Sequence, residues 1–311
     1  MVWKTNRGAD DRALFPPQSI VEIKALACEL PVKLGLPFSR LSSTDIARES
    51  VVRGVVVAIS VTTVWRYLHR DAIKPWMHRT WLFPKDPLFE EKGSRVLDLY
   101  FRLFNGIPLG PDDYVISADE KTSIQARHRK AIGVGPMPHQ PRLVEFEYDR
   151  MGAWAYLAAW DVHRAKVFGI CEKTTGIEPY HRLVDLVMGQ EPYRSARRVF
   201  WITDNGSSHR GEPSVQRLSL WYPNAIQIHT PVHASWLNQV EAYFGVLQQK
   251  VLTPNDFADL KSLEMAIFQF QTLYNQIAKP FKWEYTKDDL KKTLSRIRAR
   301  EASTHHYHLA A

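Results

Sequence analysis

Residues 198–209 read RVFWITDNGSSH, an apolar run that ends abruptly in polar residues. The β-branched and aromatic side chains between Arg198 and Thr203 favour a buried strand. Asp204 follows this strand directly. In sheets flanked by helices, functional residues commonly lie where a central strand ends. The segment therefore predicts both an α/β sheet and a site at the edge of that sheet.

Two further acids are placed in a similar way. Asp119 follows the short apolar run Tyr114 to Ala118, and Glu241 lies at the margin of the apolar stripe of a predicted helix, Ser235 to Val251. Three carboxylates at one sheet edge would repel one another unless divalent cations neutralised them, and Mg²⁺ prefers oxygen ligands. Two such ions can bind the attacking and leaving oxygens of a phosphoryl displacement. The three acids thus predict a two-metal nuclease site.

Each acid also has a purely structural interpretation. The Asp-Asn-Gly sequence that begins at Asp204 is typical of a hairpin turn, although no alternating apolar strand follows it. Asp119 is suited to capping a turn, which would make its neighbour Glu120 the relevant acid. Glu241 fits the surface of an amphipathic helix. The catalytic interpretation depends on the three acids together, in this order and on these elements.

Side chains that suit phosphate contacts lie close to the acids in sequence. His209 follows Asp204 and is within reach of a phosphate or a metal-bound water. Basic residues follow Asp119, where a nuclease needs to hold the DNA backbone: Lys121, Arg127, Arg129 and Lys130. These residues are candidate DNA contacts.

Strand and helix patterns alternate through the rest of the chain. Two strand candidates in hairpin order are Ala153 to Trp160 and Lys166 to Cys171. The segments that follow have helical patterns, with a further strand among them: Ile177 to Met188, Pro213 to Tyr222, Ala225 to His229 (the strand) and Asp259 to Ile277. Strands in hairpin order followed by alternating units predict a mixed sheet flanked by helices.

The first part of the chain predicts a small all-α module. Ser42 to Asp45 offers N-cap chemistry for one short helix, and Ser60 for a second, Val61 to His69. Apolar residues at helical spacing line one side of the second helix: Val61, Val64, Trp65 and Leu68. Two short helices joined by a turn resemble a helix-turn-helix, whose second helix reads the DNA major groove. The alternative is a helical domain with a solvated basic face.

Composition limits the class of protein. The 311 residues carry 41 Lys and Arg against 33 Asp and Glu, a formal charge of +8, and 45% are hydrophobic. This balance excludes a mainly disordered chain and favours a polyanionic partner. Two cysteines exclude a disulfide scaffold. The longest apolar run, Gly54 to Trp65, is too short to span a membrane, and no phosphate-cradling GxxxxGK[ST] motif suggests a nucleotide cofactor.

These patterns predict four segments. A helical module, a candidate for DNA binding, extends over residues 1–95, a linker over 96–113, and a candidate catalytic domain over 114–290. The remaining residues, 291–311, form a basic tail that is either a surface helix or a nucleic-acid contact.

Three segments are similar to those of one known family. ISADEKT (Ile116 to Thr122), VFWITDNGSSH (Val199 to His209) and PVHASWLNQVE (Pro231 to Glu241) resemble the DDE transposases of bacterial insertion sequences, in the branch related to the mariner superfamily. The likeness continues through VLQQKVLTPNDF, from Val246 to Phe257. It extends from about Ile46 to Leu290, which is most of the chain.

The resemblance implies a fold and a reaction. The catalytic domain would be RNase H-like, and Asp119, Asp204 and Glu241 would ligate two Mg²⁺ or Mn²⁺ ions. Water would hydrolyse a phosphodiester at each transposon end, and the released 3′-OH would attack target DNA by the same in-line chemistry. Asn205 and Asn238 occupy motif positions beside the acids and would orient the ligands.

The resemblance also implies partners. The N-terminal module would bind the terminal inverted repeats in double-stranded DNA, with Arg66 and Arg70 on the DNA, and two chains would form a homodimer that pairs two ends. The protein would be cytoplasmic and associated with a bacterial nucleoid, without a membrane partner. One departure is that family members often carry two helix-turn-helix units, whereas residues 1–40 show no second unit.

Two other functions remain open from the sequence. One is a catalytically silent, transposase-derived DNA-binding repressor, and the presence of all three acids argues against it. The other is a plain RNase H-like nuclease. The basic helical module argues against this second alternative, because a plain nuclease does not need to recognise DNA ends.

Overall fold

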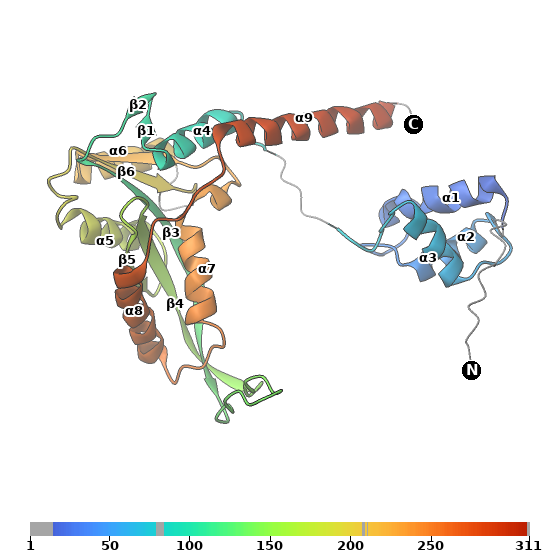
Figure 1. Ribbon diagram of the computed structural model, residues 1–311, viewed down its shortest axis with the longest axis horizontal. Coiled ribbons are helices and arrows are strands. Elements are labelled where there is room, and N and C mark those ends of the chain that lie inside the picture. Colours follow the sequence, from blue (N-terminus) through green and yellow to red (C-terminus); the bar gives the residue numbers. More distant parts are fainter. Residues whose placement is uncertain (1–14, 79–83, 207–208, 210, 310–311) are drawn as a thin grey trace, which may run out of the picture. The chain divides into compact units, whose positions relative to one another are not determined.

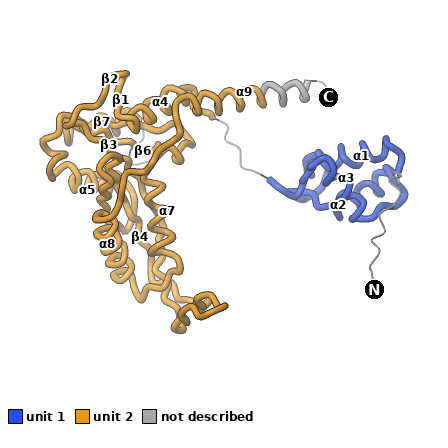
Figure 2. Tube along the Cα trace, in the orientation of Figure 1, with its two compact units in different colours: residues 1–82 blue, residues 83–311 orange. Residues whose placement is uncertain are grey.

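The computed structural model describes residues 15–78, 84–206, 209 and 211–309 (Figure 1). Contacts divide the chain after Leu82 into two compact units (Figure 2). The helical module expected over residues 1–95 is therefore shorter, because helix α4 (Phe89–Tyr100) belongs to the second unit. Among the described helices, none is long and apolar enough to cross a membrane.

The first unit consists of short helices: α1 (Pro17–Cys28), the 3₁₀ helix η1 (Pro31–Leu34), α2 (Ser43–Val52) and α3 (Val61–Arg70). A capping box begins α2, since the Ser42 hydroxyl accepts the N–H of Asp45 while the Asp45 carboxylate accepts the N–H of Ser42. Ser60 caps α3 by accepting the N–H of Thr63 at 3.1 Å. The predicted caps and helices are confirmed.

The packing of α3 differs from the predicted apolar stripe. Val64 and Leu68 are buried as expected, but Val61 and Trp65 are 42% and 47% exposed. Tyr67 is buried instead. The reason is helix α1, which the sequence pattern did not indicate and which packs against both α2 and α3. The face of α3 that carries Trp65 is consequently open to solvent.

The second unit is built on a mixed five-stranded sheet. The strands lie in the order β5 (Lys166–Glu172), β4 (Tyr148–Asp161), β3 (Asp113–Arg129), β6 (Arg198–Thr203) and β7 (Ala225–His229). β3, β4 and β5 are antiparallel neighbours, whereas β6 and β7 extend the sheet in parallel with β3. A separate hairpin is formed by β1 (Leu103–Phe104) and β2 (Ile107–Pro108). The predicted mixed sheet flanked by helices is confirmed.

Helices cover both faces of this sheet (Figure 1). One face packs against α5 (Ile177–Met188) and α6 (Gly211–Trp221), in a core that includes Ile116 and Trp201. The opposite face packs against α7 (Val240–Lys250) and α8 (Leu260–Ile277). There, the hydroxyls of Tyr156 on β4 and Tyr243 on α7 lie 3.1 Å apart. Because strand side chains alternate between faces, Ser117 and Asp119 point towards α7.

Strand β3 is longer than predicted. We expected it to end at Asp119, but it continues to Arg129 because β4 continues to pair with it. A bulge interrupts the pairing between Lys121 and Ile124, and Ser123 within it has a φ of 56°. The parallel pairing with β6 nevertheless ends at Ser117, so Asp119 still lies just beyond the end of that pairing.

The predicted helix from Ser235 to Val251 is interrupted. A 3₁₀ turn, η2 (Ser235–Leu237), is followed by the extended residue Asn238, and α7 begins after it. Trp236, which lies within the predicted helix, is 41% exposed because it comes before the break. The break places Glu241 in the first turn of α7.

The C-terminal segment is a helix, α9 (Lys287–Leu309), that begins before the expected boundary at residue 290. Leu290, Leu294 and Ile297 are buried, and α9 packs against α4. An ion pair of 2.6 Å joins Lys287 to Asp98 of α4. The beginning of the basic tail is therefore part of the second unit.

Candidate active site

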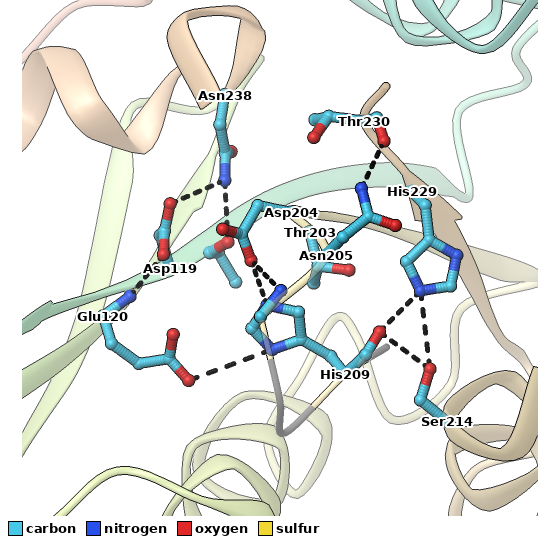
Figure 3. A network of polar contacts seen from close by, with 12 residues as sticks. Asp119, Glu120, Thr203, Asp204, Asn205, His209, Ser214, His229, Thr230 and Asn238 are labelled. Atoms are coloured by element: carbon cyan, nitrogen blue, oxygen red, sulfur yellow. Dashed lines mark hydrogen bonds and ion pairs between the residues drawn. The ribbon is translucent and has the colours of Figure 1, made fainter. Parts of the chain in front are cut away.

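Asp119 and Asp204 meet at the end of the central strands (Figure 3). Ser117 of β3 pairs with Ile202 of β6 in the parallel register, and each acid follows its paired residue by two positions. Since side chains alternate in both strands, the two carboxylates lie on the same face of the sheet. The parallel register therefore brings together two acids that are distant in sequence.

The Asp119 carboxylate is largely buried. Its Oδ1 accepts the N–H of Glu120 at 2.7 Å, and its Oδ2 accepts a longer hydrogen bond of 3.3 Å from the Asn238 amide. Burial, followed by the negative charge of Asp204, raises the pKa of Asp119 to about 7. Two neighbouring carboxylates with little compensating charge are suited to a cation.

His209 contacts the second acid. Its Nε2 forms a short hydrogen bond with Oδ1 of Asp204, and its Nδ1 lies 3.8 Å from a carboxylate oxygen of Glu120. Burial opposes the charged form of each partner, but the hydrogen bond and the neighbouring charges outweigh it. The pKa of Asp204 is consequently lowered and the pKa of His209 raised. The ring therefore lies between two acids. Its predicted contact with a phosphate or a metal-bound water stays a prediction.

The backbone of His209 is held by three side chains that the sequence analysis did not assign to the site. Its carbonyl oxygen accepts hydrogen bonds from Ser214 (2.8 Å) and Gln227 (3.1 Å), and lies 2.5 Å from Nε2 of His229 (Figure 3). Ser214 comes from α6, and the other two come from β7. For Gln227 and His229, the local signal in the sequence was the alternation of polar residues on the buried strand β7.

Asn205 has a different contact from the one expected. Its amide donates to the carbonyl of Thr230 at 2.8 Å, so it ties the segment after β6 to the end of β7. The carboxylate of Asp204 accepts the backbone N–H of Gly206 at 2.7 Å instead. Asn205 thus shapes the turn that carries Asp204.

Asn238 links the acids to helix α7. Its amide donates to the carbonyl of Ala118 at 2.9 Å as well as to Asp119, and its Oδ1 accepts a short hydrogen bond from Ser117. The Ser117 hydroxyl also accepts the N–H of Val240 at 2.9 Å. The N-cap residue of α7 makes no side-chain capping hydrogen bond, so the Ser117 hydroxyl of β3 caps the helix in its place. This contact holds the first turn of α7, which carries Glu241.

The third acid is more open than the other two. The Glu241 side chain is exposed, and partial burial of its carboxylate and the charge of Asp204 raise its pKa while Lys121 lowers it. Within the described residues, no three His, Cys, Asp or Glu side chains are close enough to form a finished metal cage. The donor set nevertheless fits a hard cation, because it consists of carboxylate oxygens and includes two neighbouring, partly buried acids, Asp119 and Asp204.

The candidate DNA contacts beyond Asp119 divide into two groups. Arg129 is committed to the chain itself, since its guanidinium donates to the carbonyls of Glu145 (2.6 Å), Asn255 (3.0 Å) and Phe146. Lys130 pairs with Glu147 at 3.1 Å on the surface. Arg127 stacks over the ring of Tyr148, and Lys121 lies near Glu241. Lys121 is the member that lies next to an acid of the site, whereas Arg127 lies farther along β3.

In the first unit, the exposed face of α3 carries Arg66 and Arg70. On the same helix, Trp65 stacks on His69, with ring centroids 4.7 Å apart. This face has basic and aromatic side chains together, as expected of a helix that contacts DNA.

Residues 114–264 match the sequence profile of a family described as DDE superfamily endonuclease. This part of the chain is therefore similar to DDE superfamily endonuclease domains. No curated protein matches the sequence. A crystal structure of the mariner Mos1 paired end complex with Mg has a similar fold, with a TM-score of 0.50 and 16% identity over 96% of this chain and 83% of that one.

A second structure, the Mos1 transposase paired-end complex with left transposon end, has a TM-score of 0.49 and 18% identity over 95% of this chain and 82% of that one. The predicted resemblance to the DDE superfamily is confirmed by the profile match, and the resemblance to mariner transposases is confirmed as a likeness of fold. At such identities the structural likeness concerns the fold. The catalytic roles of Asp119, Asp204 and Glu241 stay predictions, as does a bacterial insertion-sequence origin.

Proposed function

We propose that this protein is a DNA transposase. It binds the terminal inverted repeats of its element, hydrolyses phosphodiester bonds at the ends with two divalent metal ions, and joins the 3′-OH ends to target DNA. The observation that carries this proposal is the meeting of Asp119 and Asp204 at the end of the β3–β6 pairing, with Glu241 on the helix beside them. The match to DDE endonucleases supports the same reaction class.

The acids and the residues around them have distinct tasks in this proposal. Asp119, Asp204 and Glu241 would hold Mg²⁺ or Mn²⁺, and such ions supply Lewis-acid activation of water and stabilisation of the leaving oxygen. Asn238 orients the Asp119 carboxylate through Oδ2. His209 orients Asp204 through Oδ1. Lys121 provides positive charge next to the acids for the phosphate of the substrate.

The first unit would provide end recognition. Arg66 and Arg70 on α3 are exposed together with Trp65, which suits contact with a DNA groove and its phosphates. Binding of two ends would require two chains, so we propose a homodimer that acts on double-stranded DNA. The relatives of similar fold are described as paired-end complexes, which supports this arrangement. A cytoplasmic, nucleoid-associated location also stays a prediction.

The decisive experiment is cleavage of a plasmid that carries the native DNA flanking the gene. Wild type and Asp204→Ala are compared with Mg²⁺, with Mn²⁺ and with EDTA. Metal-dependent nicks at both flanks, absent from the variant, would support the transposase. Sequence-specific binding without cleavage would indicate a transposase-derived repressor. Cleavage with no preference for the flanks and no strand joining would indicate a plain nuclease.

A further inference from the structure

A groove lies beside the acids, along an edge of β3. β6 pairs with β3 only from Asp113 to Ser117, whereas β4 pairs with the opposite edge as far as Arg129. Beyond Ser117, the edge opposite β4 borders a cavity of about 600 Å³. The far end of this cavity is closed by the segment after α7, where the N–H of Phe257 donates to the carbonyl of Arg127 at 2.8 Å.

The charge of this groove is positive. Lys121, Arg127 and Arg129 line it, and Glu145 is the one acid among the described lining residues. The Glu145 carboxylate is already engaged, because it accepts the backbone N–H groups of Phe146 and Glu147. A polyanion is therefore the ligand that this lining favours.

Arg127 has hydrogen-bonding capacity that the described chain does not use. Its guanidinium lies over the ring of Tyr148, with 4.6 Å to the ring centroid. Its Nε is buried and has no hydrogen-bond partner among the described residues. A buried donor without a partner is costly, and a ligand phosphate that paired with the Arg127 guanidinium would offset that cost.

The rim of the groove offers an aromatic ring. Phe146 is 80% exposed and lines the cavity. Cationic grooves with exposed aromatic side chains are typical of proteins that bind single-stranded nucleic acids, because bases stack on the rings while phosphates contact the cations. The cavity has the volume of a small-molecule site, which is sufficient for individual nucleotides.

We propose that this groove binds unpaired nucleotides of the DNA strand that the acidic site acts on, with phosphates at Lys121 and Arg127 and a base on Phe146. The proposal rests on the proposed function, since that function supplies the DNA. Lys121 follows Asp119 by two positions on the same strand and thus lies on the same face. The groove therefore begins next to the acids and would guide a separated strand towards them.

Two adjacent glutamines on α7 make a matched test. Gln248 lines the groove and Gln249 does not, and both side chains are exposed. The full-length protein is titrated in EDTA with a fluorescent duplex that ends in an unpaired fork, and with a blunt duplex of the same sequence. Gln248→Glu should weaken fork binding about fivefold, because it adds a negative charge beside the phosphates. Gln249→Glu adds the same charge and should bind the fork like wild type.

Three further variants sharpen the test. Gln248→Lys should tighten fork binding, and Phe146→Ala should weaken it while Phe146→Tyr retains it. All variants should bind the blunt duplex equally. Equal fork affinity for Gln248→Glu and Gln249→Glu would overturn the proposal. So would a loss that is the same on fork and blunt duplex, or a change in oligomeric state by light scattering, since that would assign the groove to a second copy of the chain.

The outcome for the groove is separable from that for the proposed function. If wild type cleaves its flanking DNA and Gln248→Glu matches it in fork binding, only the groove proposal fails. If wild type neither binds nor cleaves DNA under any metal condition, the transposase proposal fails and the groove proposal fails with it.

Discussion

Asp119 and Asp204 each lie two residues beyond a paired residue, Ser117 of β3 and Ile202 of β6, where these parallel strands stop pairing. This relationship forces two carboxylates onto one face of the sheet at a partly buried edge. Repulsion between them and burial together raise the pKa of Asp119 to about 7. A site that keeps such a pair without a compensating Lys or Arg hydrogen bond among the described residues is suited to bind divalent cations.

The raised pKa of Asp119 predicts how stability depends on pH. Between about pH 4 and 7 the folded chain retains a proton that the unfolded chain releases, so the free energy of unfolding should fall as pH rises through this window. Asp119→Asn should remove that contribution, making the variant more stable than wild type at pH 8 by up to about 4 kcal/mol. Urea denaturation in EDTA at pH 5 and pH 8 measures the difference. Asp149→Asn, an exposed strand carboxylate, is the control, and a wild-type excess in stability at pH 8 would contradict the prediction.

Alanine variants of Asn238 and Asn275 distinguish a residue that stabilises the fold alone from one that also positions the acids of the site. Asn275 bridges α8 to both backbone groups of Val167, at 2.7 and 2.8 Å, far from the acids in the sheet order. Replacing either asparagine with alanine should lower the free energy of unfolding by about 1–3 kcal/mol, because buried partners lose their hydrogen bonds. Only Asn238→Ala should also reduce metal-dependent cleavage. Equal cleavage by the two variants would show that Asn238 merely supports the fold.

Gln227 tests the support of the His209 backbone. It is 6% exposed and donates at 3.1 Å both to the hydroxyl of Thr203 and to the carbonyl of His209. Gln227→Leu should destabilise the chain by about 1–2 kcal/mol and lower the cleavage rate, because His209 loses part of the support that aligns it with Asp204. Cleavage and thermal melting are measured side by side with the surface variant Gln216→Leu. Full cleavage activity in Gln227→Leu would mean that the remaining donors suffice.

Arg66 tests the DNA-binding role of the first unit. Arg66→Ala should weaken binding to an end-containing duplex and reduce the slope of log affinity against log salt by about 1, since one phosphate contact is lost. Lys33→Ala on η1 removes the same charge from another exposed position. Salt titrations of DNA binding by both variants test this prediction. Identical slopes for Arg66→Ala and Lys33→Ala would indicate that the DNA binds elsewhere on the first unit.

Much of the secondary structure could be predicted because its signals are local. Ser42 and Ser60 cap the helices that follow them, and the apolar run from Arg198 to Thr203 is β6 with its predicted limits. The predictions fail where a segment that is distant in sequence determines the local structure. β3 continues past Asp119 because β4 pairs with it, and Trp65 is exposed because α1 packs on the other side of α3.

The same distinction applies to the candidate site. The sequence pattern selected Asp119, Asp204 and Glu241, and it indicated His209, because acids after apolar strands and a nearby imidazole are visible in a single segment. It did not reveal the donors to the His209 carbonyl, or that Arg129 is committed to backbone carbonyls. Those contacts join segments that are remote in sequence, and hydrogen-bonding partners at such separations have no local pattern.

By itself, the sequence of this protein determined the types of its elements, the order of its acids and the class of its fold, since hydrophobic periodicity and capping act over a few residues. Only the tertiary structure decided that Asp119 stands beside Asp204 and that Ser117 sets the start of α7. Strand register and interrupted helices are set by packing between distant segments, because each buried polar group must find its partner there. The chemistry of the site depends on both.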